Sequence, residues 1–317
     1  MSVSKIKEYV TVAVLIVISS LLMAIPVPIA MVLFASLTAA LVGFSFTKFH
    51  YTYASFCVLL VFAVNLLITK NILLALTSSL PCILCGLSLG ICYNLKFSTA
   101  KFLGITSGVY LVNTIANFAL AKTNESGLSF LEEAIYSIGA IYKETLTSSG
   151  GVNVSESEVD ALITELTSML LRFMPAFIII ASICFALLGY FVFQKILIIA
   201  KSDISCFSRF SDWKADKPVS IMFLVLLVIG ILSPQGAYIS DVLANVVTAS
   251  SFVFYVLGLS YIDFKAKAQT KRRRRLLLAL IFLSTFAFMG IPYMVVSLLG
   301  ALDGCFNLRH KNETKIN

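Results

Sequence analysis

The chain has 317 residues, of which 59% are hydrophobic and only 13% are charged, and its mean hydropathy is +0.96. A soluble globular domain carries about 25% charged residues, so this composition excludes a soluble fold and predicts a protein that crosses a membrane several times. The net charge of +8 is also typical of nucleic-acid-binding proteins. Because most basic residues flank apolar segments, we predict no nucleic-acid partner.

The chain starts with Lys5 and Lys7 before an apolar segment, which we interpret as an uncleaved first span rather than a signal peptide. A membrane span needs about 20 apolar residues. Apolar windows predict about eight full spans, near residues 9–25, 29–47, 51–69, 71–93, 100–121, 173–198, 218–234 and 239–262. The predicted fold class is therefore all-α, a polytopic transmembrane helical bundle in a single membrane domain of residues 1–317.

The distribution of basic residues predicts the orientation of this bundle. If the N-terminus is cytoplasmic, 17 of the 24 Lys and Arg lie on the cytoplasmic side before the C-terminal tail is assigned, and four lie outside. Cytoplasmic segments of membrane proteins carry such an excess of positive charge. We therefore predict a multi-pass protein with a cytoplasmic N-terminus.

The largest polar segment, residues 122–172, has eight acidic and three basic residues and falls on the outer side. Apolar residues between Leu128 and Leu146 recur at helical spacing and predict an amphipathic helix. Ser155 and Glu158 have the spacing of a capping box, which predicts a second helix. The pair either rests on the outer membrane face or forms a lid over an outward-facing pocket.

Near the C-terminus, Arg272, Arg273, Arg274 and Arg275 run directly into an apolar segment at residues 276–303. As one helix this segment would be about 42 Å long, enough for a tilted span. Gly290-Ile291-Pro292 is a natural break, and we favour a hairpin of two short helices. We interpret the four arginines as a topology signal that also attracts anionic lipid head groups.

Polar residues inside the predicted spans are the candidate binding groups. Asn113 and Asn117 are four residues apart on one predicted helix, and Asp241 and Asn245 repeat that spacing on another. Polar groups at membrane depth face a bundle interior or a cavity. They either hydrogen-bond neighbouring helices or line a pocket for a small solute.

No sequence motif indicates catalysis. HExxH, P-loop and GxSxG patterns are absent, and the cysteines, including Cys82 and Cys85, lie in or beside apolar segments. We therefore predict no enzymatic activity, no metal and no cofactor. The loop 201–217 contains the single tryptophan, Trp213. Its spacing to Phe207 and Phe210 predicts one face of a short helix, either an interfacial anchor or a contact for a cytoplasmic protein.

Three stretches carry a family resemblance. Gly300-Ala-Leu-Asp303 followed by Phe306, Leu308 and Arg309 resembles the closing motif of the YybS-like family of predicted bacterial membrane proteins. The segment from Phe207 to Pro218, with Trp213, and the segment from Ala244-Asn245 to Gly258 are also similar to that family, although the proline lies further from the tryptophan here. The resemblance implies a bacterial cell membrane.

That family is functionally uncharacterised, and its membrane core resembles the S-components of energy-coupling-factor transporters. The resemblance implies a substrate-capturing transport subunit for a small solute, which docks on a T-component and ATPase subunits. Ala35 and Ala39 have the small-xxx-small spacing that such docking uses. A membrane scaffold or regulatory protein that docks cytoplasmic partners is the alternative.

Overall fold

The computed structural model describes residues 3–25, 27–123, 141, 156–233, 238–287 and 290–309. Every regular element in these ranges is a helix, which confirms the predicted all-α class. Contacts divide the chain into two compact units. Unit 1 comprises Met1–Leu171 and Ala181–Phe207, and unit 2 comprises Arg172–Ile180 and Ser208–Asn317. The single membrane domain stays a prediction, and each unit is described by itself.

The helices of unit 1 lie where the apolar windows predict spans. They are α1 (Val3–Leu22), α2 (Pro28–Lys48), α3 (Tyr51–Thr69), α4 (Ile72–Asn94), α5 (Thr99–Thr123) and the greater part of α7 (Glu156–Ile199). Local signals set their ends. Lys70 ends α3 in the left-handed conformation, and the side chain of Asn71 caps α4 by accepting hydrogen bonds from the backbone of Leu73 and Leu74.

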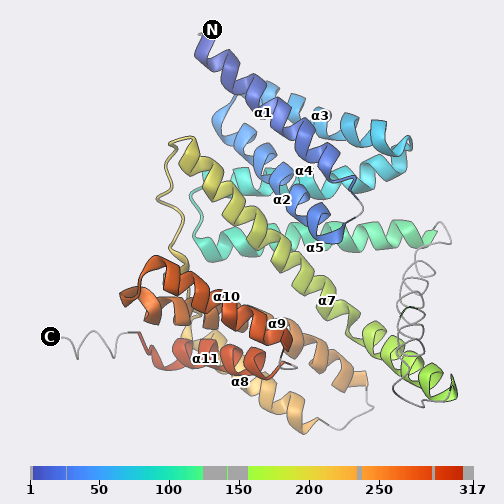
Figure 1. Ribbon diagram of the computed structural model, residues 1–317, viewed down its shortest axis with the longest axis vertical. Coiled ribbons are helices and arrows are strands. Elements are labelled where there is room, and N and C mark those ends of the chain that lie inside the picture. The colour runs from blue at the N-terminus through green and yellow to red at the C-terminus, as the bar shows by residue number, and fades with distance from the viewer. Residues whose placement is uncertain are drawn as a thin grey trace. The chain divides into compact units, whose positions relative to one another are not determined.

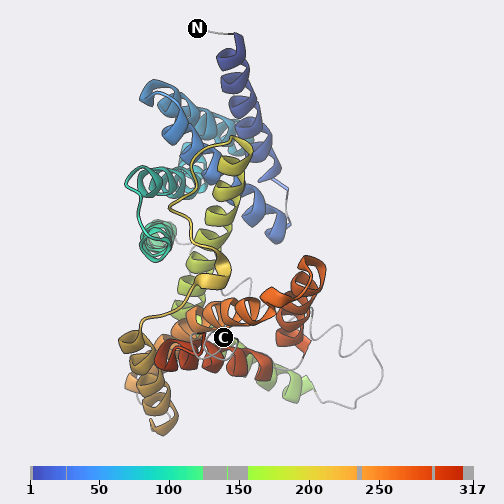
Figure 2. The same cartoon turned by 90° about the vertical axis from the view of Figure 1, so that its left-hand side faces the viewer.

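Unit 1 is centred on the contact between α2 and α4, which lie against each other (Figures 1 and 2). A Cβ atom on Gly86 of α4 would lie 2.6 Å from the carbonyl oxygen of Ala39 on α2, so only glycine fits there. Ala39 is fully buried, and Ala35 packs against the same cluster. Ala35 and Ala39, which were predicted to serve docking on a partner, therefore face the interior of unit 1.

Besides residues 172–180 of α7, the described part of unit 2 contains four helices and two short 3-10 turns. They are η1 (Phe210–Asp212), α8 (Lys217–Leu232), α9 (Tyr238–Lys265), η2 (Ala266–Ala268), α10 (Lys271–Ala287) and α11 (Ile291–Phe306). Two glycines allow α9 and α11 to approach closely. A Cβ atom on Gly258 of α9 would lie 1.9 Å from the carbonyl oxygen of Val296, and a Cβ atom on Gly300 of α11 would lie 2.2 Å from the carbonyl oxygen of Phe254. The ring of Phe254 also stacks on Phe223 of α8, with 4.2 Å between centroids.

The C-terminal apolar segment forms two helices, which confirms the predicted hairpin over a single long helix. Gly290 has a φ of +85°, a conformation that a glycine adopts without steric cost, and Pro292 lies in the first turn of α11. Helices α10 and α11 contact each other and run in opposite directions (Figure 1). The tail beyond residue 309 lies outside the described residues.

The predicted count of about eight full spans is not confirmed. Among the described residues, five helices are long and apolar enough to cross a membrane: Ile29–Lys48, Tyr51–Thr69, Ile72–Asn94, Thr164–Ile199 and Ile239–Lys265. Helices α8 and α11 are apolar but have only 16 residues each. At 1.5 Å per residue, that is about 24 Å, shorter than the hydrocarbon core of a bilayer.

The polar segment at residues 122–172 is described only in part. The predicted helix between Leu128 and Leu146, and Ser155 of the capping box, lie outside the described residues, so the lid stays a prediction. The second predicted helix does form. It is continuous with the following span in α7, a single 44-residue helix from Glu156 to Ile199.

Candidate functional site

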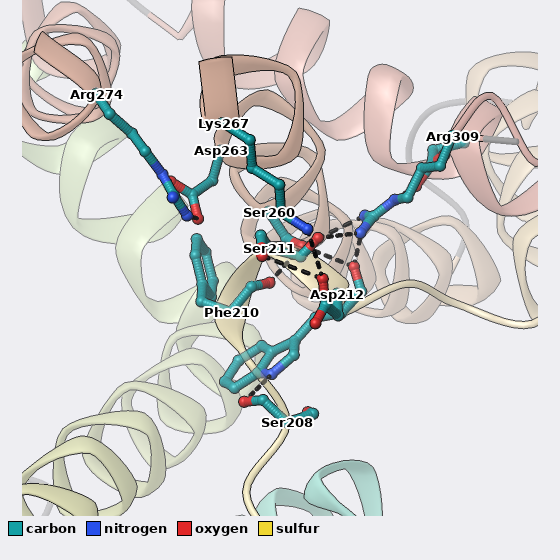
Figure 3. Close-up of polar contacts among 11 residues, drawn as sticks. Ser208, Phe210, Ser211, Asp212, Ser260, Asp263, Lys267, Arg274 and Arg309 are labelled. Carbon is teal, nitrogen blue, oxygen red and sulfur yellow. Dashed lines mark hydrogen bonds and ion pairs between the residues drawn. The ribbon is translucent and has the colours of Figure 1, made fainter. Parts of the chain in front are cut away.

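The motif residues Trp213, Gly258, Gly300, Asp303 and Arg309 gather in unit 2. Arg309 is at the centre, with only 7% of its surface exposed. Its Nε donates to Asp303 Oδ2 at 2.7 Å, its Nη2 donates to the Trp213 carbonyl at 2.7 Å, and its Nη1 donates to the Ser211 carbonyl (Figure 3). One buried guanidinium therefore joins the end of α11 to the segment before α8.

Helix α9 contributes a second contact to this cluster. The hydroxyl of Ser260 lies 2.6 Å from the Phe210 carbonyl and 2.7 Å from the Trp213 carbonyl, and it accepts from Arg309 Nη2 at 3.3 Å. The guanidinium also lies over the ring of Phe264, 5.4 Å from its centroid. We call Ser211, Trp213, Ser260, Asp303 and Arg309 the arginine cluster.

Two further ion pairs surround the arginine cluster, and each joins different elements. Arg274 of α10 makes a bidentate pair with Asp263 of α9 (Figure 3). Lys267 of η2 pairs with Asp212 of η1 at 3.0 Å. Partial burial raises the pKa of Asp212, but hydrogen bonds from Lys267 and Ser211 outweigh it and hold that pKa below its usual value.

The arginine cluster has the chemistry of a structural lock. Asp303 has a side chain only 1% exposed, and its Oδ1 has no hydrogen-bond partner among the described residues. A buried charge is tolerated only when it is paired, so Asp303 and Arg309 depend on each other. No nucleophile or proton-transfer residue is held in it by a neighbouring base, and we assign it no reaction.

The predicted aromatic face of loop 201–217 does not form. Only Phe210–Asp212 is helical, as a 3-10 turn, and Trp213 is 8% exposed in unit 2. Phe207 belongs to unit 1, where its ring lies 5.1 Å from Tyr190 and 5.6 Å from Phe102. The spacing by three misleads because the chain passes from one unit to the other between these aromatic residues.

Asp241 and Asn245 both hold α9 against α7. Asp241 forms an ion pair with Arg172, and both side chains are 42% exposed. The amide of Asn245 accepts from the Ala176 backbone N–H at 3.0 Å and donates to the Arg172 carbonyl at 2.9 Å.

These two backbone groups are the donor and acceptor of one regular helical bond of α7, so the Asn245 amide contacts both ends of the same turn. Pro175 lies inside that turn, where its ring disfavours the regular helical bond. Neighbouring side chains often restore such bonds in membrane helices. Asn245 is therefore a clamp on α7.

Asn117 of α5 has a related role in unit 1. Pro81 lies inside α4 and has no backbone N–H, so it leaves the carbonyl four residues earlier, at Thr77, without its helical donor. The Asn117 side chain donates to that carbonyl at 3.4 Å. Asn65 of α3 accepts from the Ser78 hydroxyl at 3.2 Å, so amides from two helices meet the same end of α4.

Asn113 is different, because the donor of its amide is unmatched in the described part of the chain. Only 6% of Asn113 is exposed, and its Nδ2 has no hydrogen-bond partner in the part of the chain that is described. It lies one helical turn from Asn117. Tyr110, one turn in the other direction, stacks on Phe185 with 4.2 Å between centroids. A buried donor without an acceptor costs about 1–3 kcal/mol.

The four candidate binding residues therefore divide between the units. Asn113 and Asn117 belong to unit 1, and Asp241 and Asn245 belong to unit 2. Substrate binding by them stays a prediction. Among the described residues, no group of three or more His, Cys, Asp or Glu is placed to hold a metal ion. The contacts of Ser211, Ser260 and Lys267 have no sequence signal, whereas the proline at position 81 does point to an unpaired carbonyl at Thr77.

Several long apolar helices with polar groups paired between them define a multi-pass α-helical membrane protein. The family described as predicted membrane protein (DUF2232) matches residues 12–304, and the chain belongs to that family. No curated protein and no solved structure matches it.

Proposed function

We propose that this membrane protein is a non-enzymatic solute-binding subunit and that Asn113 in unit 1 is a ligand-binding group. The observation that carries the proposal is the buried Asn113 amide, whose Nδ2 has no hydrogen-bond partner among the described residues. Buried polar groups in folded proteins are almost always paired. A ligand acceptor would remove the cost of the unmade bond.

The surroundings indicate the kind of solute. Nδ2 is a donor, so the ligand must present an acceptor such as a carbonyl or carboxylate oxygen. Tyr110, one turn away on α5, stacks on Phe185 of α7, which favours a solute with an apolar or planar part. The two asparagines therefore differ in role: Asn117 supports α4 at the Thr77 carbonyl, and Asn113 binds the solute.

The YybS-like resemblance extends the proposal to an S-component-like subunit of a bacterial cell membrane, with a cytoplasmic N-terminus. Because the sequence has no ATP-binding motif, T-component and ATPase subunits would supply the energy. Ala39 packs inside unit 1, so docking would use a face other than the Ala35 and Ala39 pair.

Native mass spectrometry of the detergent-purified full chain tests the proposal. We expect the wild-type protein to carry a small molecule and Asn113→Leu to lose it. Leucine removes the orphaned donor with little change in volume, so the ligand-free variant should unfold at the same temperature or higher. Asn94→Leu, at an exposed position at the end of α4, is the matched control and should retain the molecule.

Two results would contradict this role for Asn113. One is a wild-type protein that carries no small molecule from any membrane extract. The other is an Asn113→Leu variant that retains the molecule, or that unfolds at a clearly lower temperature, as expected if the amide served only the fold.

A further inference from the structure

The first turn of α10 is electrostatically unfavourable as it stands. Five basic residues, Lys271 to Arg275, occupy the first turn and the next position of this helix, and there is no acidic residue in that turn. A helix N-terminus carries a partial positive charge that repels cations, and like charges three and four residues apart repel each other. Negatively charged groups from another part of the chain or from a ligand would stabilise these basic residues.

The chain supplies that negative charge to only one of the arginines. Arg274 is paired with Asp263, whose side chain is 5% exposed (Figure 3). Arg272, Arg273 and Arg275 are exposed and have no carboxylate partner among the described residues. The other acids close to the arginine cluster are already occupied, because Asp212 pairs with Lys267 and Asp303 pairs with Arg309.

The Arg274 pair also fixes which face of α10 points outward. Arg272 and Arg275 are three residues apart and share the exposed face. The same face continues into exposed leucines, which are Leu276 (53% exposed), Leu280 (63%) and Leu283 (62%). One helix face thus changes from guanidinium groups to hydrocarbon between residues 275 and 276.

A phospholipid has the same division of chemistry along its length. Guanidinium groups bind phosphate oxygens through paired hydrogen bonds, and acyl chains pack on leucine side chains. We propose that Arg272 and Arg275 form a phosphate site for an anionic phospholipid, whose acyl chains lie along Leu276, Leu280 and Leu283. Arg274 is a positioning residue, and Arg273, which is also exposed, lies at the edge of this face, three residues before Leu276.

The test uses the full chain in detergent, native mass spectrometry, and phosphatidylglycerol or phosphatidylcholine with identical acyl chains. We expect preferential retention of phosphatidylglycerol and a loss of about thirtyfold in Arg272→Gln/Arg275→Gln, since each basic residue near an anionic surface contributes about 1 kcal/mol. Lys96→Gln/Lys101→Gln removes the same charge from exposed positions of unit 1 and should retain the lipid.

A folding defect is separated from a binding defect by Arg272→Lys/Arg275→Lys, which keeps the charge and loses the paired hydrogen bonds. It should retain an intermediate amount of phosphatidylglycerol. The proposal is overturned if Arg272→Gln/Arg275→Gln binds the lipid as the wild type does, or if the unit 1 variant loses as much. It is also overturned if inorganic phosphate alone displaces the lipid, or if the double glutamine variant loses a bound protein and not the lipid.

Discussion

Replacing Arg309 with glutamine should destabilise unit 2 more than any surface substitution. The change leaves the Asp303 carboxylate, 1% exposed, without the one ion-pair partner that the described residues give it, and its Oδ1 has no hydrogen-bond partner there either. It also removes donors from the carbonyls of Ser211 and Trp213. Removing one partner of a buried ion pair costs about 3–5 kcal/mol, because the remaining charge stays in a medium of low polarity.

Thermal unfolding of the purified chain in detergent measures this cost. With about 2–4 °C per kcal/mol for a chain of this size class, the midpoint should fall by roughly 10 °C. Arg209→Gln is the control, since Arg209 is an exposed arginine two residues before the Ser211 backbone contact. Its midpoint should stay within about 2 °C of the wild type, as for other exposed substitutions.

A double variant separates the lost charge pair from the lost packing. Asp303→Leu/Arg309→Met removes both charges, so no unpaired carboxylate remains, and it should unfold at a higher temperature than Arg309→Gln. The reasoning is refuted if Arg309→Gln unfolds within 2 °C of the wild type. It is also refuted if the double apolar variant is no more stable than the single one.

Two further outcomes are expected. Gly258→Ala should lower the unfolding free energy by about 1–3 kcal/mol, because its Cβ would lie 1.9 Å from the Val296 carbonyl oxygen. The control is Gly104→Ala on α5, which meets no atom within 4 Å and should be neutral or stabilising. Equal unfolding midpoints for the two variants would contradict the close approach of α9 and α11. The pKa of Asp212 is lowered, so its ionised form stabilises the fold above its unfolded pKa of about 3.9, and this contribution is lost as the pH falls through the lower folded pKa. Because Lys267 and Asp212 are 40% and 47% exposed, the stabilisation by ionised Asp212 should stay below about 1 kcal/mol. Asp212→Asn should therefore reduce the loss of stability between pH 4 and pH 3. If the variant loses stability in this pH range as the wild type does, Asp212 does not contribute to acid unfolding.

The positions of the helices follow from local features that a single sequence displays. Apolar windows place α2, α3 and α4 within one residue of their observed ends, because spans are bounded by Lys48, Lys70 and Asn71, which end or cap helices. The break at Gly290 is equally local, since a positive φ suits glycine and Pro292 fits the first turn of a helix.

The hydrogen-bond partners of the polar residues were harder to predict from the sequence than the helix positions. Asp241 and Asn245 have the same four-residue spacing as Asn113 and Asn117, and nothing in the sequence separates their roles. The structure does so, because Asn245 bonds two backbone groups of one turn of α7, whereas the Nδ2 of Asn113 has no partner among the described residues. Such roles depend on which backbone groups a neighbouring helix has left free, and that is a property of two helices together.

The sequence by itself determined that this is an α-helical membrane protein and where most of its helices lie, and it favoured a break at Gly290 in the C-terminal apolar segment. Those features depend on hydropathy and backbone preference within about 20 residues. Only the tertiary structure decided that Arg274 is bound by Asp263 and that the other three arginines are exposed, with no carboxylate partner among the described residues. Four adjacent arginines are chemically identical along the chain, and only the direction in which the helix presents each side chain distinguishes them.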